Sequence, residues 1–280
     1  MEGIVMKTWM ITGTSSGFGK ALATQVAKAS NTQLIATARN LDDLAYLDQY
    51  DHGHIKKVKL DVTDPKAIKQ AVNDALAFSS QIDVLVNNAG IGYFATSEEA
   101  DMKDVKKMFD INVFGLFDMT RAILPIMRNQ KSGTIVNITS ALALTTLPTM
   151  GYYSASKYAV EGFGDALRKE VAGLGIKVLN VEPSGARTNW SGKSSAKVVP
   201  KLADYQQFKE MVATTDSGVE NAPGNPELIA KTIIDVVNSN KEINHLPLGQ
   251  YAYQGGLDNL KSLVDEIKGL ERIALSTDDL

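Results

Sequence analysis

The chain of 280 residues is long enough for one large α/β domain or two small ones. Its 44% hydrophobic and 22% charged residues are ordinary for a globular protein. A net charge of −3 and a pI near 5.7 give no reason to expect nucleic acid or an anionic membrane as a partner. The absence of cysteine excludes disulfides, thiol catalysis and cysteine-based zinc sites, and it fits a cytoplasmic protein.

The first ten residues contain a short apolar run that we interpret as part of the first strand and not as a signal peptide. The three histidines, His52, His54 and His245, are too few and too scattered for a histidine-rich metal site. We assign all three to surface turns and expect no metal.

The first motif is a strand from Lys7 to Thr12, a glycine turn over 13–19 (GTSSGFG) and a helix to about Ala29. A helix that starts after such a turn presents free N–H groups and partial positive charge to a dinucleotide pyrophosphate. The spacing is G-x-x-x-G-x-G. The alternative is that the glycines only connect a strand to a helix.

A second strand over 33–38 completes a βαβ unit. About 20 residues after the glycines, NAD-binding proteins place an acidic residue that bonds the ribose 2′-OH. This chain has Ala38 there, followed by Arg39. A guanidinium pairs well with a 2′-phosphate, so the pattern favours NADP over NAD. A solvated arginine at a strand end is the alternative.

Two further strands end in polar residues. The strand over 55–60 ends in Asp61 and Val62, and the apolar strand over 82–86 ends in Asn87-Asn88-Ala89-Gly90. Ligands bind in the crevice at the carboxyl edge of a parallel sheet, where such residues collect. Asp61 either accepts from an adenine amino group or caps the next turn. The Asn-Asn-Ala-Gly run is either part of the site or a turn.

The segment from Met102 to about Asn129 predicts one long helix, because its apolar residues recur at helical spacing. Asn112 interrupts that apolar stripe. A buried amide needs partners, so Asn112 is either a structural hub at a helix irregularity or part of the site. Pro125 should kink the helix near its end.

Residues 132–157 carry no charge before Lys157, and their length suggests a membrane span. We reject a span because ten of the first 25 residues are Ser, Thr or Asn and because glycine and proline interrupt the run. We predict instead a buried strand over 134–139, a loop, and a helix that begins near Tyr152. The many hydroxyl groups suggest a pocket wall.

Tyr153 and Lys157 fall one helical turn apart on the same face. A free phenol has a pKa of about 10. A neighbouring ammonium lowers that pKa toward the range where acid–base catalysis is effective. Ser140 ends the preceding strand, from which its hydroxyl can hold a carbonyl oxygen beside the phenol. The alternative is an exposed pair without a role.

The remaining chain continues the α/β alternation and adds one irregular segment. Residues 189–225 show no periodic pattern beyond a short helix around 204–212, and long irregular segments are often lids. Because no linker separates domains, we expect residues 1–280 to form a single domain. The other expected elements are a helix that ends at Gly173 or Gly175, a strand over 176–182, a helix over 225–239, a strand over 242–248, an amphipathic helix over 257–273 and a tail over 276–280.

In this order, the motifs resemble those of the short-chain dehydrogenase/reductase family from about Lys7 to Leu248. The resemblance implies a doubly wound Rossmann-type oxidoreductase domain of about seven parallel strands with helices on both faces. It rests on Thr12-Gly13-x-x-x-Gly17-x-Gly19, Asp61-Val62, Asn87-Asn88-Ala89-Gly90, Asn112, Ser140, Tyr153, Lys157 and the turn over 183–188.

The resemblance also implies a role for each matching residue. Tyr153 would be the acid/base, Lys157 would lower its pKa and hold the nicotinamide ribose, and Ser140 would orient the substrate carbonyl. Asn112 would hold a water that links Lys157 to solvent, which assigns it to the site. The cofactor contacts would be Gly13, Ser15, Ser16, Gly17, Phe18, Gly19, Arg39, Asp61, Val62, Asn88, Ala89, Gly90, Tyr153, Lys157, Pro183 and Thr188.

Two residues depart from the family pattern. Ser184 stands where the family usually has glycine after Pro183, and Phe18 replaces an aliphatic residue between the last two glycines. Neither departure removes a catalytic group. Ala38 with Arg39 resembles the NADP-preferring branch.

The sequence therefore predicts a cytoplasmic carbonyl reductase that reversibly reduces a ketone or aldehyde with NADPH. The alternatives are an NAD-dependent alcohol dehydrogenase and a non-catalytic NAD(P) sensor. The family resemblance implies a homodimer or homotetramer built on the helices that contain Asn112 and Tyr153. The side chains that form either an apolar substrate pocket or ordinary core are Tyr93, Phe94, Leu142, Leu144, Met150 and Trp190.

Overall fold

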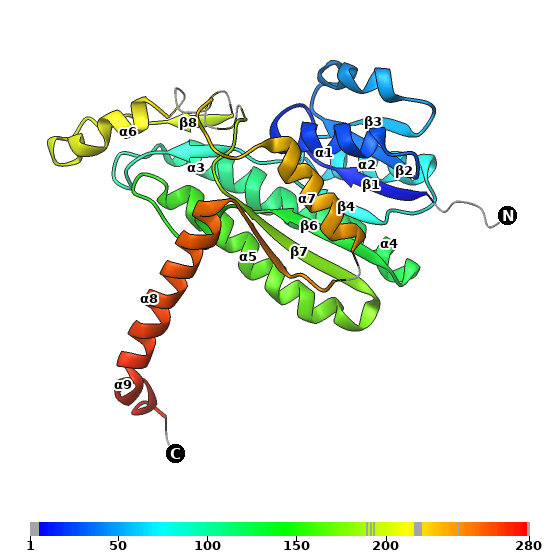
Figure 1. Ribbon diagram of the computed structural model, residues 1–280. Helices are drawn as coiled ribbons and strands as arrows, with labels where there is room; N and C mark the ends of the chain where they lie inside the picture. Colours follow the sequence, from blue (N-terminus) through cyan, green and yellow to red (C-terminus); the bar gives the residue numbers. More distant parts are fainter. Residues whose placement is uncertain are drawn as a thin grey trace.

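The computed structural model describes residues 6–188, 190, 192, 194–215, 220–239 and 241–278. Within these ranges, the main sheet has seven parallel strands in the order β3-β2-β1-β4-β6-β7-β9 (Figure 1). The strand order reverses between β1 and β4, which opens a crevice at their carboxyl ends. The predicted doubly wound α/β fold is confirmed. The strands are β1 (Lys7–Ile11), β2 (Thr32–Ala38), β3 (Ile55–Lys59), β4 (Val84–Asn87), β6 (Gly133–Ile138), β7 (Ile176–Pro183) and β9 (His245–Leu248).

Helices cover both faces of the sheet, and alternate strand residues serve the two cores. Trp9 and Ile11 face one core, while Met10 between them faces the other. The first core is closed by α1 (Gly17–Lys28) and α7 (Pro226–Asn238). The helices on the second face are α2 (Pro65–Phe78), α4 (Gly115–Gln130) and α5 (Gly151–Val171).

Side-chain caps start three of the helical segments. The Asp64 carboxylate accepts from the Lys66 N–H at 2.8 Å before Pro65 at the first position of α2. Asn225 caps α7 in the same way. Asn40 also caps its segment, but residues 41–50 form a 3₁₀ helix and not an α-helix.

The predicted long helix from Met102 is continuous to Gln130 but not uniform. It consists of α3 (Met102–Phe109), a π-helical turn (Asp110–Phe114) that contains Asn112, and α4, which continues through Pro125. Asn112 is buried in this turn, and π-turns within α-helices often occur at functional sites.

Three asparagines form a buried row across the sheet. Asn87, Asn137 and Asn180 are register partners on β4, β6 and β7. The Asn87 amide donates to Asn137 at 3.0 Å, and the Asn137 amide donates to Asn180 at 3.0 Å. Asn87 also donates to the Thr120 hydroxyl on α4. These bonds provide partners for amides that would otherwise be costly to bury.

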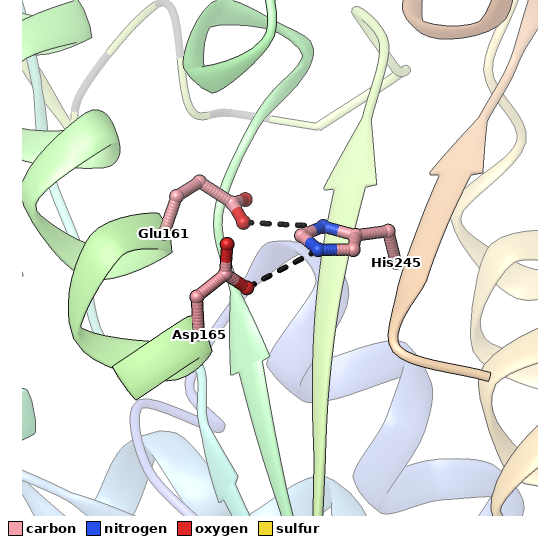
Figure 2. A group of neighbouring side chains, drawn as sticks. All are labelled: Glu161, Asp165 and His245. Carbon is pink, nitrogen blue, oxygen red and sulfur yellow. Dashed lines mark ion pairs between the residues drawn. The ribbon is translucent and has the colours of Figure 1, made fainter. Parts of the chain in front are cut away.

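His245 continues this row on β9, where it is the register partner of Asn180. Its Nδ1 lies 2.9 Å from Glu182 and 3.5 Å from Glu161, and its Nε2 lies 3.2 Å from Asp165. Figure 2 shows the imidazole facing the two carboxylates of α5, with an ion pair to each. Hydrogen bonds to Glu161 and Glu182 raise the pKa of His245 to about 10. Its assignment to a surface turn was wrong, because a charged imidazole here balances buried carboxylates.

The segment over 189–225 contains more regular structure than predicted. A short strand, β8 (Ser195–Lys197), pairs with β5 (Gly92–Phe94). A 3₁₀ turn over 203–208 and α6 (Lys209–Ala213) account for the predicted short helix. The lid prediction also includes residues 189, 191, 193 and 216–219, which lie outside the described ranges.

After β9 the chain forms a π-turn (Tyr251–Gly255), α8 (Gly256–Gly269) and α9 (Glu271–Leu275). The predicted helix over 257–273 is thus divided at Leu270. Of the predicted tail, residues 279 and 280 lie outside the described ranges. Among the helices that the structure describes, none has the length and apolarity to cross a membrane.

Two glycines of α5 give opposite predictions for the free energy of unfolding. A Cβ at buried Gly164 would overlap the Asn180 side chain, whereas a Cβ at exposed Gly162 would meet nothing. We expect Gly164→Ala to destabilise the protein by about 1–3 kcal/mol. The matched Gly162→Ala should stabilise it by about 0.5–1 kcal/mol. Urea unfolding of both variants tests this, and an unaffected Gly164→Ala would contradict the packing.

The raised pKa of His245 predicts that its contribution to the free energy of unfolding depends on pH. Because its folded pKa is raised from 6.5 to about 10, the contribution is complete below about pH 6.5 and is lost as the pH rises through 10. The side chain is 41% exposed, so solvent screens part of the interaction. We expect His245→Gln to cost on the order of 1 kcal/mol near pH 6.5.

The difference in melting temperature between wild type and His245→Gln should shrink as the pH is raised toward 10. The control is His52→Gln, since His52 lies exposed in a turn. A His245→Gln difference that stays constant from pH 6.5 to 10 would contradict the ion-pair interpretation.

Candidate active site

One cavity of about 660 Å³ opens at the carboxyl ends of the central strands, within the size range of small-molecule sites. Of the predicted site residues, Gly19 and Asn112 do not line it. Those that do are Gly13, Ser15, Ser16, Gly17, Phe18, Arg39, Asp61, Val62, Asn88, Ala89, Gly90, Ser140, Tyr153, Lys157, Pro183 and Thr188.

The glycine turn needs glycine for two different reasons. Gly13 and Gly17 have φ of 69° and 56°, in the left-handed region that glycine adopts readily. Gly19 lies in α1 under the turn, where a Cβ would overlap the Gly13 carbonyl and the Asn88 amide. Asn88 donates to the Gly13 carbonyl at 3.0 Å and so fixes the turn. Gly19 therefore shapes the site without lining it.

The N-terminus of α1 fits a bound pyrophosphate. Ser16 makes no side-chain capping bond, and the first turn of α1 carries no acidic residue. The first N–H groups of the helix and its partial positive charge therefore remain available to an anion. Gly13, Ser15 and Gly17 form the cavity wall at this point. This end of the cavity suits the diphosphate of a dinucleotide.

At the adjoining end, Arg39 and Asp61 line the cavity after β2 and β3. The Asp61 carboxylate accepts from the Thr63 N–H at 3.0 Å and from its hydroxyl at 2.8 Å. The backbone bond from Thr63, its hydroxyl and the charge of Arg39 lower the pKa of Asp61. Asp61 thus caps its turn and also lines the cavity, and its contact with an adenine amino group stays a prediction.

Asn112 lies behind the cavity wall. Its carbonyl oxygen accepts from the Ile91 N–H at 2.8 Å, and its amide donates to the Ile91 carbonyl at 2.9 Å and the Ser156 hydroxyl at 3.3 Å. A Cβ at Gly90 would lie 3.3 Å from the Asn112 oxygen and 3.7 Å from Lys157 Nζ. Asn112 therefore anchors the loop after β4 beside Lys157.

Ser140, Tyr153 and Lys157 meet in the centre of the cavity. Ser140 lies two residues after the end of β6 and accepts from the Leu142 N–H at 3.1 Å, and its side chain partly offsets the raised pKa of the Tyr153 phenol. Lys157 Nζ donates to the Ile138 carbonyl at 2.9 Å and lies 5.8 Å from the centre of the Tyr153 ring. The first two turns of α5 thus face the end of β6.

Burial dominates the protonation of this pair. It raises the pKa of Tyr153, and the bond with Ser140 offsets only part of that rise. It also lowers the pKa of Lys157 to about 8, against the opposing charge of Glu161. The expectation that Lys157 lowers the pKa of the phenol is wrong for this structure, because burial raises that pKa and only the bond with Ser140 opposes the rise. At neutral pH the phenol carries its proton.

Apolar side chains surround the phenol on the other side of the cavity. The Trp190 ring lies 4.8 Å from that of Tyr153 and 5.8 Å from that of Phe94, centre to centre. Two of the predicted pocket residues do not line the cavity: Tyr93 is core, with its hydroxyl accepting from the Asp101 N–H, and Leu144 packs beside Gly256. The apolar lining residues include Phe94, Leu142, Leu147, Met150, Trp190 and Tyr251.

Sequence reasoning missed Leu147 and Tyr251. Tyr251 follows β9, about a hundred residues after Tyr153, and no local pattern marks it. Ser184 helps to place it, since its hydroxyl accepts from the Ala252 N–H at 2.8 Å. The serine that replaces the usual glycine therefore ties the segment after β9 to the turn after β7.

A family model described as short chain dehydrogenase matches residues 7–198. The chain belongs to the short-chain dehydrogenases. A short-chain dehydrogenase from Streptomyces avermitilis, known from its crystal structure, is 34% identical with a TM-score of 0.89, over 98% of each chain. The 3-ketodihydrosphingosine reductase of Bacteroides thetaiotaomicron is 36% identical over 197 residues, which cover 70% of each protein.

ElxO, solved with NADP bound, is 25% identical with a TM-score of 0.71, over 86% of this chain and 96% of that one. The family resemblance of the motifs is confirmed. The short-chain dehydrogenase described here is an oxidoreductase that acts on CH–OH or carbonyl groups of small molecules, and a nicotinamide nucleotide is its cofactor.

Proposed function

We propose that the protein is an NADPH-dependent carbonyl reductase that reversibly converts a ketone or aldehyde into an alcohol, with Tyr153 as the acid/base. The observation that carries the proposal is that the buried Tyr153 phenol lines the same cavity as Ser140, Lys157 and the glycine turn. When bound there, the reduced nicotinamide supplies hydride to the carbonyl carbon.

Residues of the chain would then bind and protonate the carbonyl oxygen. The hydroxyls of Ser140 and Tyr153 would hold it, and Tyr153 would give it a proton as negative charge develops. Because burial keeps the phenol protonated at neutral pH, the site is prepared for proton donation, which is the direction of reduction. Lys157, beside the phenol, supplies positive charge and would bind the nicotinamide ribose.

Asn112 would support this proton transfer from behind the wall. It fixes the loop that carries Gly90, next to the Lys157 ammonium, and would hold a water between Lys157 and solvent. We also propose that the remaining cavity-lining site residues, with Gly19 beneath the glycine turn, hold the cofactor. They are Gly13, Ser15, Ser16, Gly17, Phe18, Gly19, Arg39, Asp61, Val62, Asn88, Ala89, Gly90, Pro183 and Thr188.

The preference for NADPH rests on Arg39. It lines the cavity directly after β2, and the preceding residue is Ala38 where an NAD-binding protein would place an acid. A guanidinium suits a 2′-phosphate.

The substrate proposal follows from the lining around Tyr153. Phe94, Met150 and Trp190 suit a medium-sized apolar carbonyl compound. The name of the related 3-ketodihydrosphingosine reductase supports ketone reduction. We propose that segment 189–225 acts as a lid over this end, and that the protein is a homo-oligomer that pairs through α4 and α5.

Tyr153→Phe tests the acid/base role. We expect kcat for ketone reduction to fall by more than about 10²-fold, the scale of lost general acid catalysis, while NADPH affinity is retained. Tyr152→Phe is the matched control, because the Tyr152 hydroxyl contacts the Ser97 carbonyl instead. Steady-state kinetics and NADPH fluorescence titration measure both properties. Near-normal turnover by Tyr153→Phe would refute the role.

Arg39→Asp tests the cofactor preference. We expect the ratio of kcat/KM for NADPH to that for NADH to fall by at least about tenfold, because the carboxylate repels a 2′-phosphate and accepts from a 2′-OH. Lys231→Asp makes the same change of charge on the outside of α7 and should leave the ratio unchanged. Equal use of both cofactors by the wild type would overturn the argument from Arg39.

A further inference from the structure

Residues 256–275, which comprise α8 and α9, form a C-terminal arm that extends away from the sheet and its helices (Figure 1). All residues from 257 to 275 are exposed. At its base, Gly256 packs beside Leu144, and the Asn259 amide donates to the Leu144 carbonyl at 2.9 Å. The arm is anchored at one end and exposed along its length.

The arm carries a stripe of apolar side chains. At 100° per residue, six of them fall on one face of α8 and its end and form the stripe. These six are Leu257, Leu260, Leu263, Val264, Ile267 and Leu270. A single 14-residue helix is marginal in water without a partner for its apolar face. The exposed apolar residues of the arm, each 45–67% accessible, are Leu257, Leu260, Leu263, Val264, Ile267, Leu270, Ile273 and Leu275.

We propose that this stripe packs against the arm of a second copy of the same chain. The proposal is independent of the catalytic role of Tyr153. Two arms that meet through their stripes would form a helical pair, and each would bury the face that the other leaves exposed.

The charges of the arm favour a second copy over a lipid surface. The arm carries three cations and four anions, whereas helices that bind anionic membranes are rich in Lys and Arg. Lys261 and Lys268 border one side of the stripe, and Glu266 borders the other. If two arms pair in parallel, the lysines of one copy lie beside the glutamate of the other copy.

The exposed area of the stripe also favours a contact between two arms. Its six half-exposed aliphatic side chains offer roughly 540 Å² per arm, at roughly 90 Å² each, about two thirds of the ~800 Å² per partner of a standard interface. An arm–arm contact therefore supplies a large part of the apolar surface that a stable interface between two copies buries.

The first test is the mass of the full-length protein in solution. Val264→Glu places a charge in the centre of the stripe, and Ser262→Glu adds the same charge on the opposite face. By sedimentation equilibrium at equal concentration, we expect the wild type and Ser262→Glu to share one mass and Val264→Glu to have half of it. Unchanged thermal unfolding of Val264→Glu shows that its fold is intact. A Val264→Glu mass equal to that of the wild type would overturn the proposal.

The second test uses the absence of cysteine from the chain. We place single cysteines at Leu260, Val264 or Ile267, with Ser262→Cys as the control, and oxidise the full-length proteins. Two arms that pair in parallel should cross-link at all three stripe positions. Two arms that pair antiparallel should cross-link only at the stripe position nearest the two-fold axis. Cross-linking at none of them, or equally at Ser262→Cys, rejects arm pairing.

Phosphatidylglycerol vesicles separate pairing from membrane binding. We expect the wild type and Val264→Glu to sediment equally little with these vesicles. Wild-type sedimentation that is lost in Val264→Glu, without a change in solution mass, would assign the stripe to lipid and overturn the proposal.

Discussion

The arrangement of the cavity depends on burying a phenol and an ammonium side by side. Removal from water raises the pKa of Tyr153 and lowers that of Lys157 to about 8, so burial disfavours the charged form of each group. Two such groups stay in place only if the surrounding backbone is held firmly. Ser140 bonds the phenol, and the Ile138 carbonyl accepts from the ammonium, so the end of β6 holds both. The geometry between β6 and α5 is therefore the constraint that the site depends on.

The polar row across the sheet explains how α5 keeps that position. Asn180 accepts from Asn137 and donates to Glu161 on α5 at 2.6 Å, and His245 joins Glu161 to Glu182. These bonds connect α5 laterally to strands β4, β6, β7 and β9 below the level of the cavity. Hydrophobic packing tolerates sliding, whereas directional hydrogen bonds between buried polar groups favour one register. The carboxyl ends of the strands thereby remain free to form the crevice.

The sequence predicts the sheet and most of the cavity wall because both follow from local rules. Residues after parallel strands share one edge of the sheet, so Gly13, Asp61, Asn88 and Ser140 gather without knowledge of their contacts. What local patterns could not supply was non-local. His245 meets Glu161 through the register of β9 on β7, and the phenol's pKa is set by burial, which a Tyr-x-x-x-Lys spacing does not reveal. Tyr251 reaches the cavity by the same long-range pairing of β9.

The segment after β9 joins the cavity to the arm. Ser184, which follows Pro183 in the cavity wall, accepts from the Ala252 N–H, and Tyr251 beside that N–H lines the cavity. Four residues later Gly256 begins α8 and packs on Leu144, which follows the 3₁₀ turn after Ser140. A glycine at position 184 would lack the hydroxyl that anchors this turn. The departure from the family pattern therefore fixes one end of a short segment, and the contact of Gly256 with Leu144 holds the other end, so that whatever holds the arm also holds the apolar wall against which a substrate would lie.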